Sequence, residues 1–173
     1  FSSYDMARFN PVVPGTSLPM VIIDTSRMRN RFEARPANNM GYQNPTEAEL
    51  VADVLEAMLK NMSKKEQAEY LGKLGDKLGV ISAYGAQVRH IRQVLCRRLH
   101  ISAAEAATAV ASLDSFQGQE RDLIIYSLTR SDRKRSTQAR VGFLKELRRL
   151  NVAFTRCKKQ LVIIGDLDYL QSC

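Results

Sequence analysis

Apolar positions divide the chain into short runs that suit strands and longer periodic segments that suit helices. The short runs are mostly aliphatic or β-branched and predict buried strands at 20–24, 79–83, 109–113, 123–128 and 161–165. Apolar residues recurring every three or four positions predict helices at 46–61, 87–99 and 145–154. The segment 27–44 is polar and is interrupted by proline, asparagine and glycine, so it predicts a loop.

Two helices have a polar start signal in the sequence. Thr46 and Glu49 have the spacing of a capping box, and so do Ser63 and Glu66. The helix from Ser63 is more polar and fades near Gly72 or Gly75, which is typical of a surface insertion.

Near-continuous apolar strands alternating with helices favour a parallel, doubly wound α/β sheet. Such strands are buried on both faces, and ligands of these sheets gather at the carboxyl ends of the strands. Residues 1–19 lack periodicity and are rich in proline, so we expect an irregular lead-in or linker there and one domain over 20–173. The chain begins with Phe1, and we expect it to be part of a longer protein.

Composition indicates a globular intracellular domain, cytoplasmic or nuclear. The sequence is 45 % apolar and 25 % charged, and no apolar run is long enough for a bilayer span. The three cysteines are odd in number and lack metal-ligand spacing, so we expect reduced thiols and no metal site. His90 and His100 lie apart in a basic stretch and receive no role.

Positive charge is concentrated in the last third of the chain. The net charge is +8, and residues 130–159 hold eleven Lys or Arg against Asp132 and Glu146. A field of this sign attracts polyanions, with nucleic acid ahead of acidic membranes or protein partners. For a charge run alone, a solvated face kept basic for solubility is about as frequent as a functional patch that binds a polyanion.

Two blocks in this region carry more specific information. Residues 112–122 form a polar loop in which Gly118 permits close backbone approach, and residues 148–156 set arginines along a helix before the last strand. With the segments 81–87 and 141–144, these blocks resemble, in order and spacing, motifs IV, V and VI and the G-F-L connector of superfamily 1 helicases. The chain is similar to the second RecA-like domain of the branch that contains the nonsense-mediated-decay RNA helicase.

The resemblance implies a nucleotide site shared with another domain. Arg156 takes the position of the arginine finger that stabilises transition-state charge on the γ-phosphate of ATP. Glu120 takes a position near the ribose or phosphates, and the resemblance places further cofactor-binding residues in the cleft, namely Tyr84, Gln87, Arg89 and Gly118. The best-known relative has an arginine directly after the glutamine, where this chain has Val88 and then Arg89. Arg89 is therefore a candidate only.

The chain has no G-x-x-x-x-G-K-[ST] phosphate loop and no D-E-x-x motif after an apolar strand. The resemblance therefore implies that ATP and Mg²⁺ are held mainly by an amino-terminal RecA-like domain that lies outside this sequence. It also implies single-stranded RNA or DNA as a partner, contacted by strand ends of motif V. The candidate nucleic-acid residues are Ser112, Asp114, Thr129 and Arg130.

These inferences predict the carboxyl-terminal RecA-like half of an ATP-dependent superfamily 1 helicase, inactive as an isolated fragment. One alternative is a nucleic-acid-binding or scaffold module that has this fold without turnover. Another is one motor part of a nuclease or repair assembly.

Overall fold

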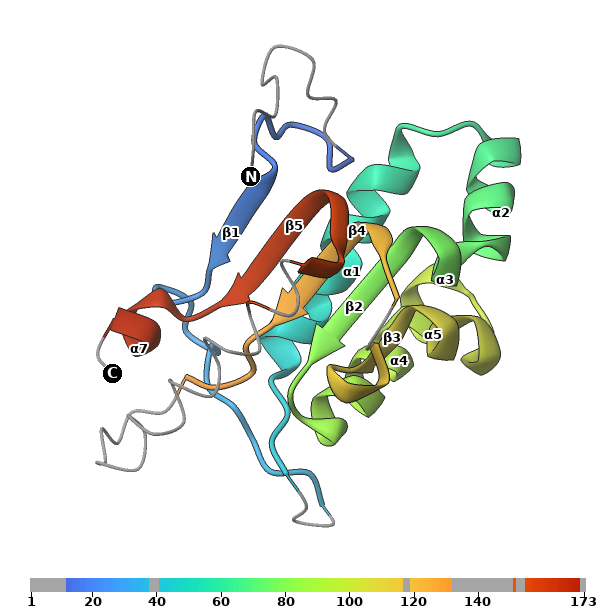
Figure 1. Cartoon of the computed structure of the whole chain (residues 1–173). Helices are drawn as coiled ribbons and strands as arrows, with labels where there is room; N and C mark the ends of the chain where they lie inside the picture. The colour runs from blue at the N-terminus through green and yellow to red at the C-terminus, as the bar shows by residue number, and fades with distance from the viewer. Residues whose placement is uncertain (1–11, 38–40, 117–118, 132–150, 152–154, 172–173) are drawn as a thin grey trace.

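The structure is a computed structural model that describes residues 12–37, 41–116, 119–131, 151 and 155–171 (Figure 1). Its centre is a sheet of five parallel strands in the order β1-β5-β4-β2-β3. The strands are Met20–Asp24 (β1), Leu78–Ser82 (β2), Val110–Ser112 (β3), Arg121–Ser127 (β4) and Cys157–Gly165 (β5). All five predicted strands are present, and the α/β RecA-like fold class is confirmed.

One face of the sheet is covered by helices (Figure 1). Leu123 and Ile125 of β4 point into this layer, together with Val162 of β5. The layer consists of α1 (Pro45–Lys60), α3 (Leu74–Lys77), α4 (Gly85–Leu99) and α5 (Ala103–Ala109). The intervening residues Ile124 and Tyr126 point to the opposite face, where they pack with Phe116. This alternation explains why β4 reads as a continuous apolar run, because both of its faces are buried.

Phe116 belongs to a short 3-10 helix, Asp114–Phe116 (η2), in the connection between β3 and β4. The helix predicted for 145–154 lies almost wholly outside the described residues. The remaining helices are α2 (Lys64–Gly72), which starts with the predicted Ser63 capping box, and α7 (Leu167–Gln171), which was not predicted.

The predicted capping box at Thr46 is wrong. Asn44 caps α1 instead, since its side chain accepts a hydrogen bond from the Glu47 amide at 3.1 Å and Pro45 occupies the first turn. Proline has no amide hydrogen to satisfy and its φ suits a helix start, so the helix begins one residue earlier than expected. A capping box that was not predicted, Ser102 with Glu105, opens α5.

Residues 12–19 contain no helix or strand but are attached to β5. The Gln160 side chain accepts hydrogen bonds from the amides of Val12 and Val13 at 2.9 and 2.8 Å and donates to the Leu18 carbonyl. Val13 is buried. Within the described part of the chain, no helix has the length and apolar content that a bilayer crossing requires.

Candidate functional site

Parallel strands give the sheet one amino-terminal edge and one carboxyl-terminal edge, and polar residues gather at both. At the amino-terminal edge Arg121 of β4 pairs in register with Cys157 of β5. Glu120 and Arg156 directly precede these partners and therefore lie just before two neighbouring strands, side by side. The fold thus brings together two of the residues that the resemblance assigns to the nucleotide.

The acidic groups of the amino-terminal edge have lysine partners. Glu120 lies 3.6 Å from the Lys158 ammonium, and Asp122 lies 2.9 Å from the Lys159 ammonium and 3.9 Å from that of Lys77. Arg156 has no ion pair with any described residue, and its buried Nε has no hydrogen-bond partner among them. A half-buried guanidinium without an ion pair can donate hydrogen bonds to an anionic oxygen without first breaking another contact.

Arg121 occupies the same edge but is engaged locally. Its guanidinium donates to the Gln119 side chain at 2.7 Å and to the Glu120 carbonyl at 2.9 Å. It also lies over the Phe116 ring at 5.3 Å. Arg121 therefore braces the start of β4. Burial raises the pKa of the neighbouring Cys157 thiol to about 11, so this cysteine is not a reactive thiolate at neutral pH.

At the carboxyl-terminal edge, a buried polar network joins the start of α1 to the end of β4. Glu47 is fully buried and accepts hydrogen bonds from the Ser127 hydroxyl at 2.6 Å, the Thr129 amide at 2.8 Å and the Asn44 side chain at 3.1 Å. Gln87 of α4 is also fully buried. It exchanges hydrogen bonds with the Asn44 backbone and donates to Ser127 Oγ at 3.0 Å.

Burial raises the pKa of Glu47 from the ordinary 4.5 to about 8. The hydrogen bonds from Ser127 and Thr129 oppose this rise, and the nearby carboxylates of Glu33 and Asp166 add to it. Glu47 is therefore mainly protonated at neutral pH. A protonated carboxyl avoids most of the cost of burying a charge without a cationic partner.

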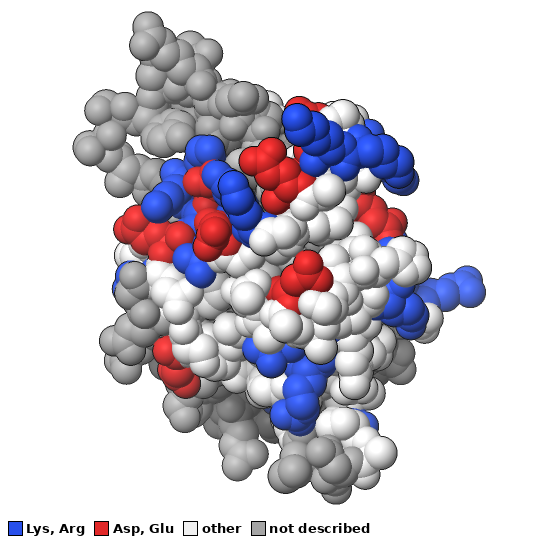
Figure 2. All heavy atoms as spheres, turned by 90° about the vertical axis from the view of Figure 1, so that its right-hand side faces the viewer, with Lys and Arg blue, Asp and Glu red and all other residues white. Residues whose placement is uncertain are grey.

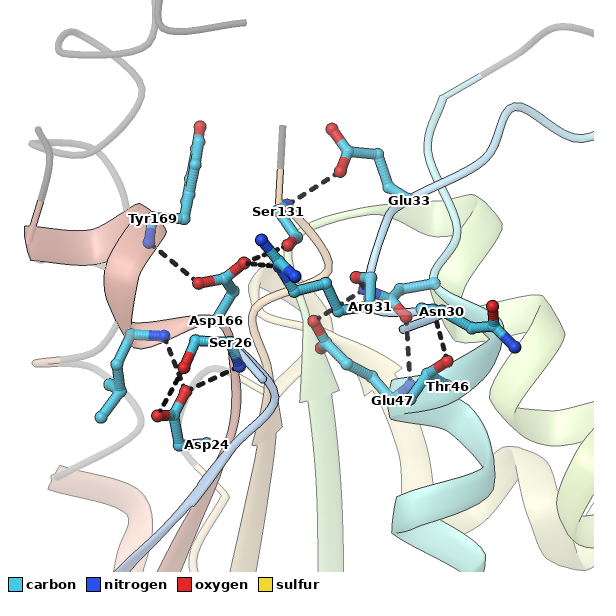
Figure 3. A network of polar contacts seen from close by, with 12 residues as sticks. Asp24, Ser26, Asn30, Arg31, Glu33, Thr46, Glu47, Ser131, Asp166 and Tyr169 are labelled. Atoms are coloured by element: carbon cyan, nitrogen blue, oxygen red, sulfur yellow. Dashed lines mark hydrogen bonds and ion pairs between the residues drawn. The ribbon is translucent and has the colours of Figure 1, made fainter. Parts of the chain in front are cut away.

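Two further carboxylates hold the residues that follow β4 (Figure 3). Glu33 accepts from Arg130 Nε at 2.7 Å and from the Ser131 amide at 2.8 Å. Asp166, after β5, accepts a hydrogen bond from the Ser131 hydroxyl and pairs with Arg31 Nε at 2.9 Å. Figure 3 shows Glu33, Glu47 and Asp166 around this segment, each supplied by a different part of the chain.

Arg130 is the centre of an aromatic and charged cluster at this edge. Its guanidinium lies 4.2 Å from the centroid of the Tyr42 ring, which packs edge-on against Tyr84 at 5.8 Å. The Arg35 guanidinium also lies over the Tyr42 ring, 4.8 Å from its centroid, and donates a hydrogen bond to the Tyr42 hydroxyl. Burial lowers the pKa of Arg130, but the Glu33 carboxylate and other partners outweigh this and raise the pKa overall. Arg130 thus stays charged at every accessible pH.

The predicted site residues are divided between the two edges. Glu120 and Arg156 share the amino-terminal edge, and Gly118 lies outside the described residues. Tyr84 follows β2 at the carboxyl-terminal edge, Gln87 is buried there, and Arg89 is exposed near the start of α4. The structure therefore does not bring Tyr84 or Gln87 together with Arg156, because β4 spans roughly 20 Å at about 3.3 Å per residue.

The predicted nucleic-acid residues lie at the carboxyl-terminal edge or in the connection that leaves it. Ser112 ends β3, and its hydroxyl lies 2.9 Å from that of Ser115. Asp114 is exposed in η2, Arg130 is partly exposed, and Thr129 is completely buried. The Thr129 side chain therefore offers no exposed group at this edge.

Sequence reasoning gave no site role to the acids that shape this edge or to several arginines. Glu47 stands on the apolar stripe of its helix, one turn before Val51, and an acid at such a position is a detectable sign of a buried carboxyl. After β1, four arginines lie within the nine residues 27–35, and this density of positive charge is also visible in the sequence: Arg27, Arg29, Arg31 and Arg35. Glu33 and Asp166 carried no such signal.

The layer of helices does not present a single-sign basic surface. Figure 2 shows the side of the molecule that lies to the right in Figure 1, where α2, α3 and α5 stand, and its described residues have lysine and arginine interspersed with aspartate and glutamate. Arg98 of α4 illustrates the arrangement, since it pairs with Glu49, Asp53 and Glu56 at 3.1, 2.8 and 2.7 Å.

Comparison with known proteins identifies the family. A family model described as an AAA domain matches residues 5–168. DNA polymerase alpha-associated DNA helicase A of Saccharomyces cerevisiae is 37 % identical over 159 residues, which are 91 % of this chain and 21 % of that protein. Helicase sen1 of Schizosaccharomyces pombe is 30 % identical over 142 residues, which are 82 % of this chain and 8 % of that protein.

The regulator of nonsense transcripts 1 homolog of Arabidopsis thaliana is 36 % identical over 131 residues, which are 75 % of this chain and 9 % of that protein. The chain therefore spans about a fifth or less of the length of these relatives. Its order of motifs, its parallel sheet and these matches agree, and the chain belongs to the AAA domain family that forms the carboxyl-terminal region of superfamily 1 helicases.

Proposed function

We propose that this domain is the carboxyl-terminal RecA-like half of an ATP-dependent nucleic-acid helicase and that it supplies the arginine finger, Arg156. ATP and Mg²⁺ are held mainly by an amino-terminal RecA-like domain of the same protein. The described residues contain no group of three or more acidic, histidine or cysteine side chains placed to hold a metal ion.

The observation that carries the proposal is the pairing of Arg121 with Cys157, which sets Glu120 and Arg156 next to each other at the amino-terminal edge. Arg156 brings a guanidinium without a carboxylate partner among the described residues, whereas Glu120 already has Lys158. A preorganised cation of this kind stabilises the negative charge that develops during phosphoryl transfer.

The carboxyl-terminal edge is proposed as the path of a single strand of RNA or DNA. Ser112, Asp114, Thr129 and Arg130 belong to it, and the arginines after β1 extend it, with Arg27, Arg29 and Arg35 exposed. Contacts there go to phosphate and sugar, so binding is nearly independent of sequence. Tyr84 and Arg89 lie at this edge, and we assign them to the strand and not to the nucleotide.

Nucleotide and strand thus occupy opposite edges of one rigid sheet in this proposal. Closure of the two RecA-like domains on ATP brings Arg156 to the γ-phosphate and moves the carboxyl-terminal edge relative to the strand. Hydrolysis and release reopen the cleft. Because the sheet does not need to deform, the movement of the whole domain converts nucleotide chemistry into displacement along the strand.

The test is the steady-state ATPase activity of the whole protein with Arg156→Ala and Arg156→Lys. We expect kcat to fall by at least about 100-fold in both, because arginine fingers contribute on the order of 1,000-fold or more. KM for ATP should change far less. Arg97→Ala is the matched control, since this exposed arginine of α4 pairs with Glu49 and lies outside the proposed site. Unchanged hydrolysis in Arg156→Ala contradicts the catalytic assignment and favours a binding module without turnover.

A further inference from the structure

Thr129, two residues after β4, has an unfavourable backbone conformation. Its φ is +71°, in the left-handed region, although threonine is β-branched. A residue held in this conformation costs stability, and it persists only where the surrounding structure determines it fully. Such strain is concentrated at ligand clamps and active sites.

Buried side chains hold every polar group of Thr129. Its amide donates to Glu47 at 2.8 Å, its carbonyl accepts from the Asn44 side chain at 3.2 Å, and its hydroxyl lies 2.9 Å from Ser82 Oγ. Asn44 and Glu47 both belong to the start of α1. The start of one helix therefore binds both the amide and the carbonyl of the strained residue.

The strained turn determines where the next two residues go. The Arg130 amide donates back to the Leu128 carbonyl at 2.8 Å, which completes the turn. Arg130 then reaches Glu33 and Tyr42, while Ser131 reaches Glu33 and Asp166. The position of the guanidinium at 130 thus depends on the conformation at 129.

Stability alone does not explain a carboxyl at position 47. Glu47 is fully buried and has no cationic partner among the described residues, and its neighbours Glu33 and Asp166 are acidic. Burying such a group costs more than burying an apolar residue of similar size. A buried carboxyl at this position is explained if it makes hydrogen bonds that function requires and that an apolar side chain cannot make.

We propose that Glu47, with Asn44, is the positioning residue of the nucleic-acid edge, and that it acts by holding Thr129 in the left-handed turn that aims Arg130. This inference rests on the proposed function, because it presumes a strand at the carboxyl-terminal edge. Glu47 itself does not touch the strand.

Glu47→Leu removes the acceptor, Glu47→Gln keeps an acceptor for Thr129 without a titrating group, and Glu49→Gln is the control on the same helix. Binding of labelled oligo-uridine and oligo-thymidine by the whole protein is measured by fluorescence anisotropy, with circular dichroism to verify folding. We expect Glu47→Leu to lose about tenfold or more in affinity, since small misplacements of a contact are costly. Glu49→Gln should bind like the wild type.

A double-mutant cycle separates positioning from a general structural role. Glycine adopts a positive φ without strain, so the loss of affinity caused by Glu47→Leu should be smaller in a Thr129→Gly background than in the wild-type background, whatever Thr129→Gly does to affinity by itself. An equal loss in both backgrounds overturns the proposal, because Glu47 would then not act through Thr129. A folded Glu47→Leu variant with wild-type affinity overturns it as well.

If Glu47→Leu does not fold, the dependence of strand affinity on pH provides the test. Ionisation of Glu47 places a negative charge beneath the strand, so wild-type affinity should weaken between about pH 7 and 9. The charged groups that act on Glu47 are Glu33 and Asp166, which are themselves paired with Arg130 and Arg31, whereas α4 and β2 contribute the uncharged Gln87 and Ser82 to the same network. Glu47→Gln should flatten this profile, and an unchanged profile overturns the proposal. A wild-type protein that binds no single strand at all refutes the proposed function itself and this inference with it.

Discussion

Glu33 Oε1 and Arg130 Nε lie 2.7 Å apart, and the two side chains are only 8 % and 20 % exposed. The pair joins the loop after β1 to the residues after β4, and the Tyr42 ring covers the guanidinium. A charge pair shielded from water in this way is worth more than a surface pair, because solvent does not screen it.

The Glu33–Arg130 pair should therefore show strong energetic coupling. A double-mutant cycle with Glu33→Gln and Arg130→Met, followed by urea unfolding, should give a coupling energy of about 1–3 kcal/mol. The control is the exposed pair Glu69 and Lys73 of α2 and its cap, whose atoms lie 3.6 Å apart. Its coupling should stay below about 0.5 kcal/mol. Equal coupling in the two cycles would contradict the interpretation of a buried clamp.

The stability of the fold should depend on pH through Glu47. The folded state keeps the Glu47 proton up to about pH 8, whereas the unfolded chain loses it near 4.5. Between these values the unfolded state binds fewer protons, so the free energy of unfolding falls as pH rises, by at most about 1.4 kcal/mol per pH unit. Above about pH 8 this contribution is level.

Glu47→Gln should remove this slope. Urea unfolding at several pH values should show the stability of the variant, relative to the wild type, rising from acidic pH to about pH 8 and then remaining constant. Glu49→Gln provides the comparison. A stability difference that does not vary with pH would show that Glu47 is ionised in the folded state at neutral pH.

Single-strand binding should weaken steeply with salt, because phosphate contacts release counterions. Each contact contributes a slope of about −0.7 in a plot of log affinity against log salt. Arg130→Ala should make the slope shallower by about that amount, and Arg97→Ala should leave it unchanged. Affinity that stays constant between roughly 50 and 200 mM salt would rule out the phosphate-contact model.

The crossing from β3 to β4 should be sensitive to a single methyl group at Gly79 of β2. A Cβ at this position would lie 2.5 Å from the Phe116 ring and 2.7 Å from Ile124, both in the core beneath the connection. Gly79→Ala should therefore lower the free energy of unfolding by about 1–3 kcal/mol. At Gly72, at the end of α2, a Cβ would meet nothing within 4 Å. Gly72→Ala should be neutral or slightly stabilising, and a similar loss at both positions would indicate another cause.

Local sequence signals were sufficient for most elements of this fold. The run 161–165 predicted β5 because a strand buried on both faces must be apolar throughout, and Ser63 with Glu66 predicted the start of α2 because a capping box involves only residues of one turn. The start of α1 was predicted at the wrong residue because two capping signals overlapped there, and Pro45 favoured the earlier one, Asn44.

The site was predictable only in part. The family resemblance singled out Arg156 and Glu120, but it also grouped Tyr84 and Gln87 with them. The parallel register separates these pairs by the full length of β4, and no pattern along the chain reports which edge of a sheet a residue reaches.

The sequence by itself determined the fold class, the five strands and the motif order, because apolar periodicity and short turn signals are local properties. The tertiary structure alone decided that Glu47 meets Thr129, 82 residues later, and that Glu33 meets Arg130. These contacts depend on how parallel strands align, and a buried acid differs from a solvated one only in what the folded chain places around it.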